Sequence, residues 1–419
     1  MPFFTGFTCV GCRTRYSADQ DLLLCPACES LLEADYDYPS IRSAVDRDSI
    51  ASRPVSVWRW RELLPVLNDR AIVSLGEGDT PMLRCDRLAR FAGVRELWVK
   101  SDASNPTGSL KDRSITVSAT KAVEFGYRVL SCDSTGNKAS SVAAYAARAG
   151  LASVVFCPED TPAPKVTQSL FFGARLIRVR GHYAQINAMY RRLIQSGSVK
   201  WYDCGTDNPF RYEGKKTYAY EIARHFDWAV PDRVVHPANG GMSVAKTWKG
   251  FNELRSLGWI DALPKMSAVQ AANCDPIVRA FNAGAKEVAP IEKGATIAGA
   301  LAGADPGLLG ARALKALRDS GGNAIGVRDE ETVEAMQLLA QEGLFIEPSG
   351  AVAVAGIRRL IAEGKASPDE RVVCVVTGSG FKDMDRIAER VRVPEEVVVD
   401  YEGMLAAAHA VQSEGSLTR

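Results

Sequence analysis

Short apolar runs alternate with segments of helical periodicity from about residue 70 onward. The runs are rich in Val, Ile and Leu and predict buried strands at residues 97–100, 128–132, 152–157, 175–180, 233–237, 267–271 and 371–376. Between them, apolar positions with a helical repeat predict helices at residues 111–126, 140–150 and 330–343. Strands that alternate with helices are typical of βα units. We therefore expect an α/β fold with largely parallel sheets and helices on both sheet faces.

The first forty residues do not follow this pattern. Cys9 and Cys12 form one CxxC pair, and Cys25 and Cys28 form a second pair twelve residues later. Two such knuckles can place four thiolates around one tetrahedral zinc ion, which would stabilise a segment with so small a core. We predict a zinc ribbon over residues 1–40 with a structural metal. A pair of disulfides and a ribbon without metal are the alternatives.

Composition narrows the class of protein. The chain has 419 residues, of which 46% are hydrophobic and 24% charged, which is typical of globular proteins rather than disordered or membrane-spanning ones. A formal net charge of +1 provides no basic surplus that would favour nucleic acid or an anionic membrane. Six further cysteines are scattered along the chain, which favours a reducing compartment, the cytoplasm.

Polar loops follow several of the predicted strands, where ligands bind in parallel sheets. Lys111 lies at the head of a helix, where the helix dipole and burial lower the pKa of an amine and suit it to form a Schiff base with an aldehyde cofactor. An ordinary solvated first turn is the alternative. The loops at 134–137 and 239–243 offer free backbone amides for a carboxylate or phosphate, or are plain capping loops. A fourth glycine turn lies at 375–383.

Together, and in this order, these motifs resemble those of the pyridoxal-phosphate-dependent lyases of the tryptophan-synthase-β type (fold type II), and of the threonine synthases in particular. The resemblance extends from about Leu75 to about Asp383, and the zinc-ribbon start is similar to that of some threonine synthases. It implies two doubly wound domains, at 41–215 and 216–395, followed by a C-terminal tail at 396–419. The residues after Val393 themselves predict a strand and a helix packed on the surface. The resemblance also implies a homodimer.

The resemblance assigns roles to individual residues of the cofactor site. NPTGSLKDR implies that Lys111 carries the cofactor, and STGN implies that Asn137 contacts its phenolic oxygen. TGSG implies that Thr377 is the partner of the pyridine nitrogen, and a threonine there favours threonine synthase over its cysteine synthase and dehydratase relatives. The cofactor's phosphate is expected on the loop formed by Asn239, Gly240, Gly241, Met242 and Ser243.

The expected substrate is a small amino acid that carries a phosphate. The resemblance implies that Ser134 and Thr135 bind its α-carboxylate and that Arg211 binds its phosphate. The chain departs from the family pattern nearby, with Lys138 in place of the usual Thr and Gly205-Thr206 in place of an Asn-Ser pair. Lys138 either compensates by binding the same phosphate, binds another anion such as a sulfonate, or points to solvent.

We therefore expect conversion of O-phospho-L-homoserine and water to L-threonine and phosphate. A divergent β- or γ-replacement enzyme acting on another anionic amino acid is the alternative, for example a cysteate synthase that uses O-phosphoserine and sulfite. A non-catalytic protein whose ribbon binds a partner is a third reading. Retention of Lys111, Asn137, Arg211 and Thr377 argues against it. No nucleic-acid or membrane partner is expected.

Overall fold

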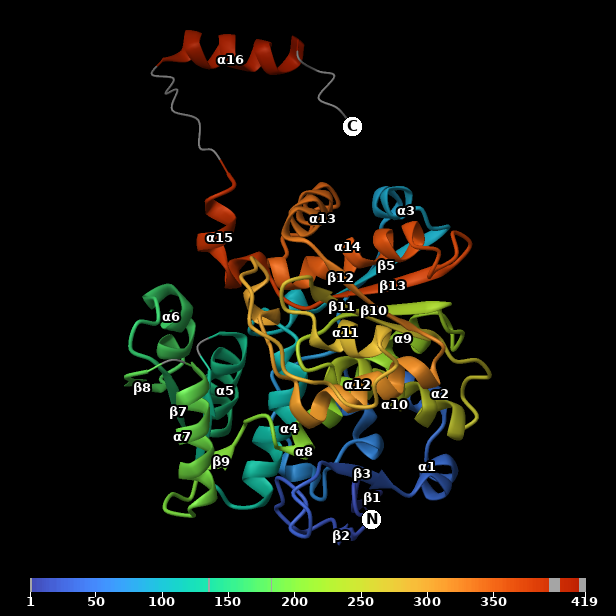
Figure 1. The fold of residues 1–419 in the computed structure, drawn as a ribbon, viewed down its shortest axis with the longest axis vertical. Coiled ribbons are helices and arrows are strands. Elements are labelled where there is room, and N and C mark those ends of the chain that lie inside the picture. The colour runs from blue at the N-terminus through green and yellow to red at the C-terminus, as the bar shows by residue number, and fades with distance from the viewer. Residues whose placement is uncertain (1, 135, 182, 392–399, 414–419) are drawn as a thin grey trace. The chain divides into compact units, whose positions relative to one another are not determined.

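The computed structural model describes residues 2–134, 136–181, 183–391 and 400–413, and the chain divides into two compact units, Met1–Asp383 and Met384–Arg419. The second unit contains helices α15 (Met384–Ala388) and α16 (Tyr401–Ser413) (Figure 1). The helix expected in the tail is confirmed as α16, whereas the expected strand lies outside the described residues. All three sheets belong to the first unit.

The N-terminal sheet is the small antiparallel sheet expected of a ribbon, with strand order β2-β1-β3. Its strands are β1 (Phe4–Cys9), β2 (Arg15–Ser17) and β3 (Leu32–Tyr36). One face packs on the rest of the unit, where the rings of Phe7 and Phe210 meet edge to face at 4.8 Å. The ribbon therefore shares a core with the body of the protein.

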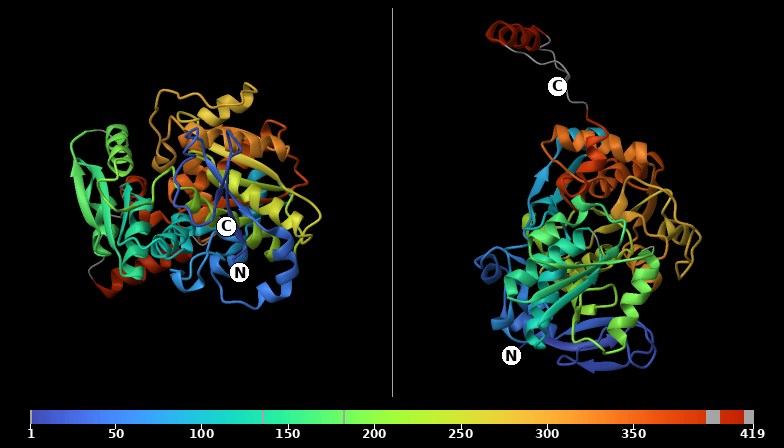
Figure 2. Two further views of the ribbon diagram at one scale, coloured as in Figure 1. Left: turned by 90° about the horizontal axis from the view of Figure 1, so that it is seen from below. Right: turned by 90° about the vertical axis from the view of Figure 1, so that its left-hand side faces the viewer.

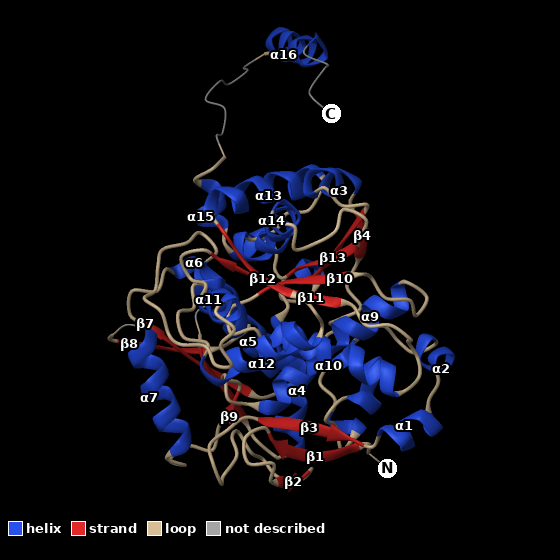
Figure 3. Ribbon diagram, turned by 45° about the vertical axis from the view of Figure 1, so that its right-hand side comes forward, coloured by secondary structure: helices blue, strands red, loops and turns tan. Residues whose placement is uncertain are grey.

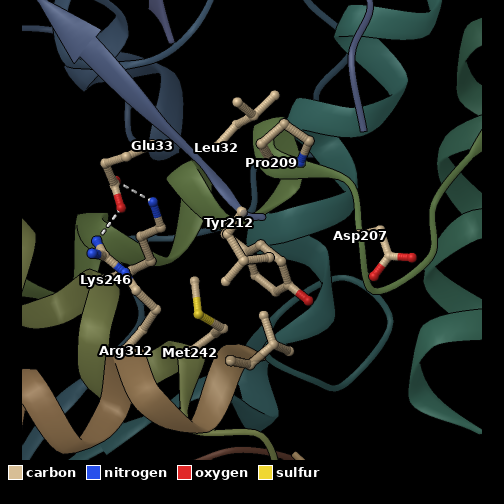
Figure 4. Close-up of a pocket in the computed structure, with 10 residues that line it drawn as sticks. Leu32, Glu33, Asp207, Pro209, Tyr212, Met242, Lys246 and Arg312 are labelled. Atoms are coloured by element: carbon tan, nitrogen blue, oxygen red, sulfur yellow. Dashed lines mark hydrogen bonds and ion pairs between the residues drawn. The ribbon is translucent and has the colours of Figure 1, made fainter. Parts of the chain in front are cut away.

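An acidic side chain of the ribbon joins it to the same body. Glu33 on β3 forms ion pairs with Lys246, Lys249 and Arg312, which lie on two helices of the body. Figure 4 shows Glu33 between Lys246 and Arg312 at the wall of a small hollow, with Met242 at its floor. Opposite charges thus hold the ribbon to the body beside their apolar contact.

The largest sheet has six strands in the order β12-β11-β10-β13-β5-β4. All of its pairs are parallel except the edge pair β4–β5. Valine is the most frequent residue of these six strands, and most of their residues are buried, as suits strands covered on both faces. The bounds are β4 (Met82–Arg84), β5 (Glu96–Ser101), β10 (Arg233–Pro237), β11 (Lys265–Ala271), β12 (Asn323–Val327) and β13 (Arg371–Val376).

A second, wholly parallel sheet has four strands in the order β8-β7-β6-β9. Its strands are β6 (Val129–Asp133), β7 (Ala152–Pro158), β8 (Arg175–Val179) and β9 (Tyr202–Asp203). Figure 2 shows this sheet and its helices to one side of the larger sheet. All seven strands predicted from apolar runs are present. The short strands β4, β9 and β12 were not predicted.

Helices cover both sheets. Figures 1 and 3 show α3, α13 and α14 on one face of the six-stranded sheet and α10, α11 and α12 on the other. The helices of the first unit are α1 (Tyr38–Ala44), α2 (Arg47–Ala51), α3 (Asp86–Ala92), α4 (Lys111–Glu124), α5 (Asn137–Ala149), α6 (Ala163–Phe171), α7 (Tyr183–Gln195), α8 (Pro209–Glu213), α9 (Thr217–His225), α10 (Met242–Ser256), α11 (Pro276–Asn282), α12 (Gly307–Asp319), α13 (Asp329–Gln341) and α14 (Pro348–Ala362). The three predicted helices correspond to α4, α5 and α13. Of the described helices, none is both long and apolar enough to cross a membrane.

The expected α/β architecture with mainly parallel sheets is confirmed. The sheets do not divide the chain in two consecutive halves, however. Strands β4 and β5 join the six-stranded sheet together with β10 to β13, and the four-stranded sheet is built from the residues between β5 and β10. A domain boundary near residue 215 remains a prediction, and strands from both sides of it enter the larger sheet.

A buried ion network ties α4 to the end of β5 and to α9. Arg113 is fully buried and forms two hydrogen bonds with Asp102, at 2.8 and 2.9 Å, and two with Glu221. Lys100 lies 2.6 Å from Glu221, and Arg113 also donates to the hydroxyl of Thr217. Although burial opposes ionisation, Arg113 and Lys100 hold the pKa of Glu221 below its usual range. The network therefore fixes the start of α4 by several charged contacts at once.

Replacing Arg113 with Met is expected to lower the free energy of unfolding by about 3–5 kcal/mol, because buried Asp102 loses its ion-pair partner and Glu221 keeps only Lys100. The matched control is Arg84→Met, which breaks only an exposed ion pair with Asp86 and is expected to leave the free energy of unfolding nearly unchanged. Urea denaturation followed by circular dichroism measures both. Equal losses in the two variants would contradict the importance of the buried network.

Candidate functional site

Lys111 is the first residue of α4 and lies beside the turn that follows β13. The backbone amide of Leu110 donates to the carbonyl of Thr377 at 2.9 Å, and Ser109 forms an antiparallel bridge with Gly378. Asp112 accepts hydrogen bonds from the amide and hydroxyl of Thr107, at 2.7 and 2.6 Å, and so closes the turn before the helix. The structure thus brings Lys111 and Thr377 together, although they are 266 positions apart in the chain.

The environment of Lys111 favours an unprotonated amine. Burial, together with the nearby cations Arg211 and Lys138, lowers the pKa of Lys111 to about 8, and Glu347 opposes this shift. An amine with such a pKa is available as a nucleophile and a base close to neutral pH. The predicted Schiff-base lysine therefore lies in surroundings that suit that chemistry.

Asn137 begins α5 and points toward Glu347. Its amide nitrogen lies 3.1 Å from both carboxylate oxygens of Glu347. Burial raises the pKa of Glu347 to about 6, against the lowering effects of Asn137 and Lys111. Gly136 precedes the helix without a side-chain cap, so the first amides of α5 remain available to an anion.

Arg211 on α8 is buried and incompletely bonded. One terminal nitrogen donates to the carbonyl of Gly205 at 2.6 Å, whereas its Nε has no hydrogen-bond partner among the described residues. A Cβ at Gly205 would lie 2.5 Å from a carboxylate oxygen of Asp203, so a larger residue here would require the Asp203 side chain to move. Among the described residues, no ion pair within 4.0 Å is found for Arg211, and a buried guanidinium with an unpaired N–H is suited to bind an anionic ligand.

Lys138 is buried and does not point to solvent, so that alternative is wrong. Its ammonium donates to Asp133 at 2.7 Å. Burial would raise the pKa of Asp133, but the Lys138 ammonium holds it below its usual value. Lys138 still contributes to the positive potential around Lys111.

The loop before α10 forms a cradle of backbone amides. Gly241 has φ +80°, and a Cβ there would lie 2.3 Å from the Cβ of Ala313, so only glycine fits. No side chain caps the N-terminus of this 15-residue helix. Met242 turns its side chain into the hollow beside the ribbon (Figure 4), which leaves only its amide for a ligand. Asn239 bonds to the carbonyl of Ala300 and is exposed.

The structure thus gathers Lys111, Asn137, Lys138, Arg211 and Thr377 around one site. Ser134 lies in the loop between β6 and α5, whereas Thr135 lies outside the described residues.

Sequence reasoning missed two charged members of this group. Glu347 begins the segment EPSGA (347–351), directly before α14, and no role was predicted for it from the sequence. Lys215, in the short 3-10 turn Gly214–Lys216, donates to Ser243 at 3.1 Å. Only the fold reveals that this lysine faces the α10 loop.

The four N-terminal cysteines form a compact cluster. Their sulfurs all lie within 4.8 Å of one another, with 3.5 Å between Cys9 and Cys28 and 3.6 Å between Cys12 and Cys25. A tetrahedral zinc ion with bonds of about 2.3 Å would hold its sulfurs about 3.8 Å apart, so the cluster fits a metal ion. All of the cysteines are free thiols, which contradicts the disulfide alternative.

Comparison with known proteins identifies relatives over most of the chain. Residues 73–378 match the family described as pyridoxal-phosphate dependent enzyme. A threonine synthase of Methanocaldococcus jannaschii is 42% identical, over 94% of this chain and 96% of its own length. A threonine synthase of Methanosarcina acetivorans is 40% identical, over 93% and 95% respectively.

Solved structures share the fold at lower identity. Serine racemase from Dictyostelium discoideum superposes with a TM-score of 0.60 at 22% identity, over 72% of this chain and 92% of its own. This likeness supports the fold type II architecture.

The lowered pKa of Lys111 predicts a specific labelling behaviour in the cofactor-free protein. Acetylation of Lys111, followed by mass spectrometry, is expected to rise with pH to half its maximum near pH 8. In the urea-unfolded protein the same residue is expected to require a pH near the ordinary value of about 10.4. The same midpoint in both samples would contradict the effect of the folded environment.

Proposed function

This chain belongs to the family of pyridoxal-phosphate-dependent enzymes, and we propose that within it the chain is a threonine synthase, which converts O-phospho-L-homoserine and water to L-threonine and phosphate. The observation that carries the proposal is the buried Arg211 guanidinium, which lies near Lys111 with one N–H unpaired. A substrate phosphate would supply the missing acceptor. The similarity to threonine synthases over nearly the whole chain supports the same conclusion.

The residues present fit pyridoxal phosphate. Lys111 would hold the aldehyde, the amides from Gly241 to Ser243 would hold the phosphate, and Thr377 would face the pyridine nitrogen. A neutral hydroxyl at that position leaves the ring nitrogen largely unprotonated. When bound, the cofactor serves as an electron sink that acidifies the C–H bonds of the amino acid.

The side chains around the cofactor would bind the substrate and move its protons. The first amides of α5, with Ser134, Thr135 and Asn137, would hold the α-carboxylate. The amine of Lys111 would remove the proton at Cα and, once protonated, would donate a proton to another atom of the bound substrate. Its pKa of about 8 allows both the neutral amine and the ammonium near neutral pH.

Arg211 would hold the phosphate that leaves. We assign Lys138 to the same phosphate as a second cation, because both positive charges act on Lys111 from close by. The pairing of Lys138 with Asp133 fixes the position of the ammonium without removing its field. Arg211 and Lys138 together would supply the phosphate contacts of the usual Asn-Ser pair, in whose place this chain has Gly205 and Thr206.

The cysteine cluster supports a further proposal of a structural zinc ion held by Cys9, Cys12, Cys25 and Cys28. Four protein ligands leave no open position on the metal, so its role is to stabilise the ribbon. The free thiols favour a cytoplasmic location. A homodimer is proposed on the family resemblance alone.

The reaction can be tested by incubating the cofactor-loaded enzyme with O-phospho-L-homoserine and measuring phosphate and amino-acid products. Equal amounts of phosphate and threonine are expected. Lys111→Ala is expected to lower the rate by at least about a hundredfold, because the proton-transferring amine is lost. Lys286→Ala, which changes an exposed lysine, is the control and is expected to be unaffected. Failure of the wild-type enzyme to form threonine would overturn the proposal.

Metal analysis tests the zinc site. About one equivalent of zinc is expected per chain by mass spectrometry, and Cys12→Ser is expected to lose most of it and to unfold at a temperature several degrees lower. Cys157→Ser, which lies outside the cluster, is expected to retain the metal. Purified protein that is stable without any bound metal would contradict the proposal.

A further inference from the structure

Lys215 differs from the other buried lysines of the structure. It is only 7% exposed, and among the described residues no carboxylate lies within 4.0 Å of its ammonium. The other described lysines that are comparably inaccessible to solvent each have a carboxylate partner, and they are Lys100, Lys121, Lys138, Lys216 and Lys246. The single hydrogen bond found for its ammonium goes to the hydroxyl of Ser243, a neutral group.

A buried ammonium without an anion is costly, and the cost is increased here by two neighbours. Burial, followed by the positive charges of Lys111 and Arg211, holds the pKa of Lys215 well below its usual value. An anion placed next to Lys215 would restore the charged form and remove the repulsion. The site is therefore electrostatically incomplete without an anionic ligand.

The partner of Lys215 indicates where that anion binds. Ser243 is the second residue of α10, and Gly241 precedes it with uncapped amides that form the cradle described above. The ammonium approaches this helix N-terminus at 3.1 Å from the Ser243 hydroxyl. Both the helix dipole and Lys215 thus favour negative charge at one point.

We propose that Lys215 is a ligand of the cofactor's phosphate and supplements the backbone amides of the α10 loop with a full positive charge. This inference rests on the proposed function in requiring that the cofactor be pyridoxal phosphate. Lys215 and Arg211 then divide the two phosphates of the reaction between them. Arg211, anchored to the carbonyl of Gly205, binds that of the substrate, and Lys215, anchored to Ser243, binds that of the cofactor.

The test compares two aldehydes that differ only in the phosphate. Cofactor-free wild type, Lys215→Gln and the control Lys286→Gln are titrated with pyridoxal phosphate and with pyridoxal, and binding is followed by visible absorbance. Glutamine is close to lysine in length and can still donate to Ser243, but it carries no charge. Lys215→Gln is expected to bind pyridoxal phosphate about ten- to a hundredfold more weakly, as for loss of a charge-assisted hydrogen bond, with pyridoxal affinity unchanged.

A second readout follows the ionisation of the bound phosphate by ³¹P NMR. A neighbouring ammonium favours the dianion, so the resonance of the bound phosphate is expected to titrate at a higher pH in Lys215→Gln than in wild type. A role that is only structural would not shift this titration.

Three results would overturn the inference. Equal loss of affinity for both aldehydes, together with a lower melting temperature, would make Lys215 a packing residue. Unchanged cofactor affinity with a raised KM for O-phospho-L-homoserine would assign Lys215 to the substrate's phosphate. An unchanged affinity for both aldehydes, together with an unchanged KM and an unchanged phosphate titration, would show that Lys215 binds neither phosphate.

The two proposals fail in different ways. Cofactor affinity is measured without substrate, so an enzyme that binds pyridoxal phosphate through Lys215 and yet forms no threonine would disprove only the proposed reaction.

Discussion

The site depends on the buried contact between Arg113 and two carboxylates. Asp102 follows β5, Glu221 lies on α9, and Arg113 occupies the first turn of α4. Since Lys111 lies two residues before Arg113, the network that fixes the guanidinium also fixes the backbone that carries the reactive amine. Hydrogen bonds to charged groups are directional and strong in a dry interior, so this anchor leaves Lys111 little positional freedom.

Charge is distributed unevenly around that anchor. In the network of Asp102 and Glu221, the buried cations Lys100 and Arg113 both have carboxylate partners. Among the cations that surround Lys111 in the site, Lys138 is paired with a carboxylate, whereas Arg211 and Lys215 have no such partner among the described residues. Paired charges stabilise the scaffold, whereas unpaired ones repel one another until an anion arrives. The same residue types thus serve structure on one side and ligand binding on the other.

The sequence was informative where the signal is local. Apolar runs predicted seven of the strands, and the motif NPTGSLKDR predicted that Lys111 lies at the start of a helix. Strand β9, with two residues, and β12, whose five residues include a polar Asn323 and Gly326, carry too little pattern to be recognised. Neither the pairing of Lys138 with Asp133 nor the isolation of Lys215 could be predicted, because each depends on which segments the fold brings together.

The pairing of β5 with β13 has a consequence for how the chain is made. Glu96 and Arg371 are bonded although they are 275 positions apart, so β5 leaves the ribosome long before its neighbour exists. Until then, the backbone N–H and C=O groups of β5 that face β13 have no partner strand. An unpaired strand edge can form backbone hydrogen bonds with strands of other nascent chains, which leads to aggregation. Synthesis of this protein therefore includes an interval of aggregation risk that ends only when β13 emerges, and slow translation would prolong it.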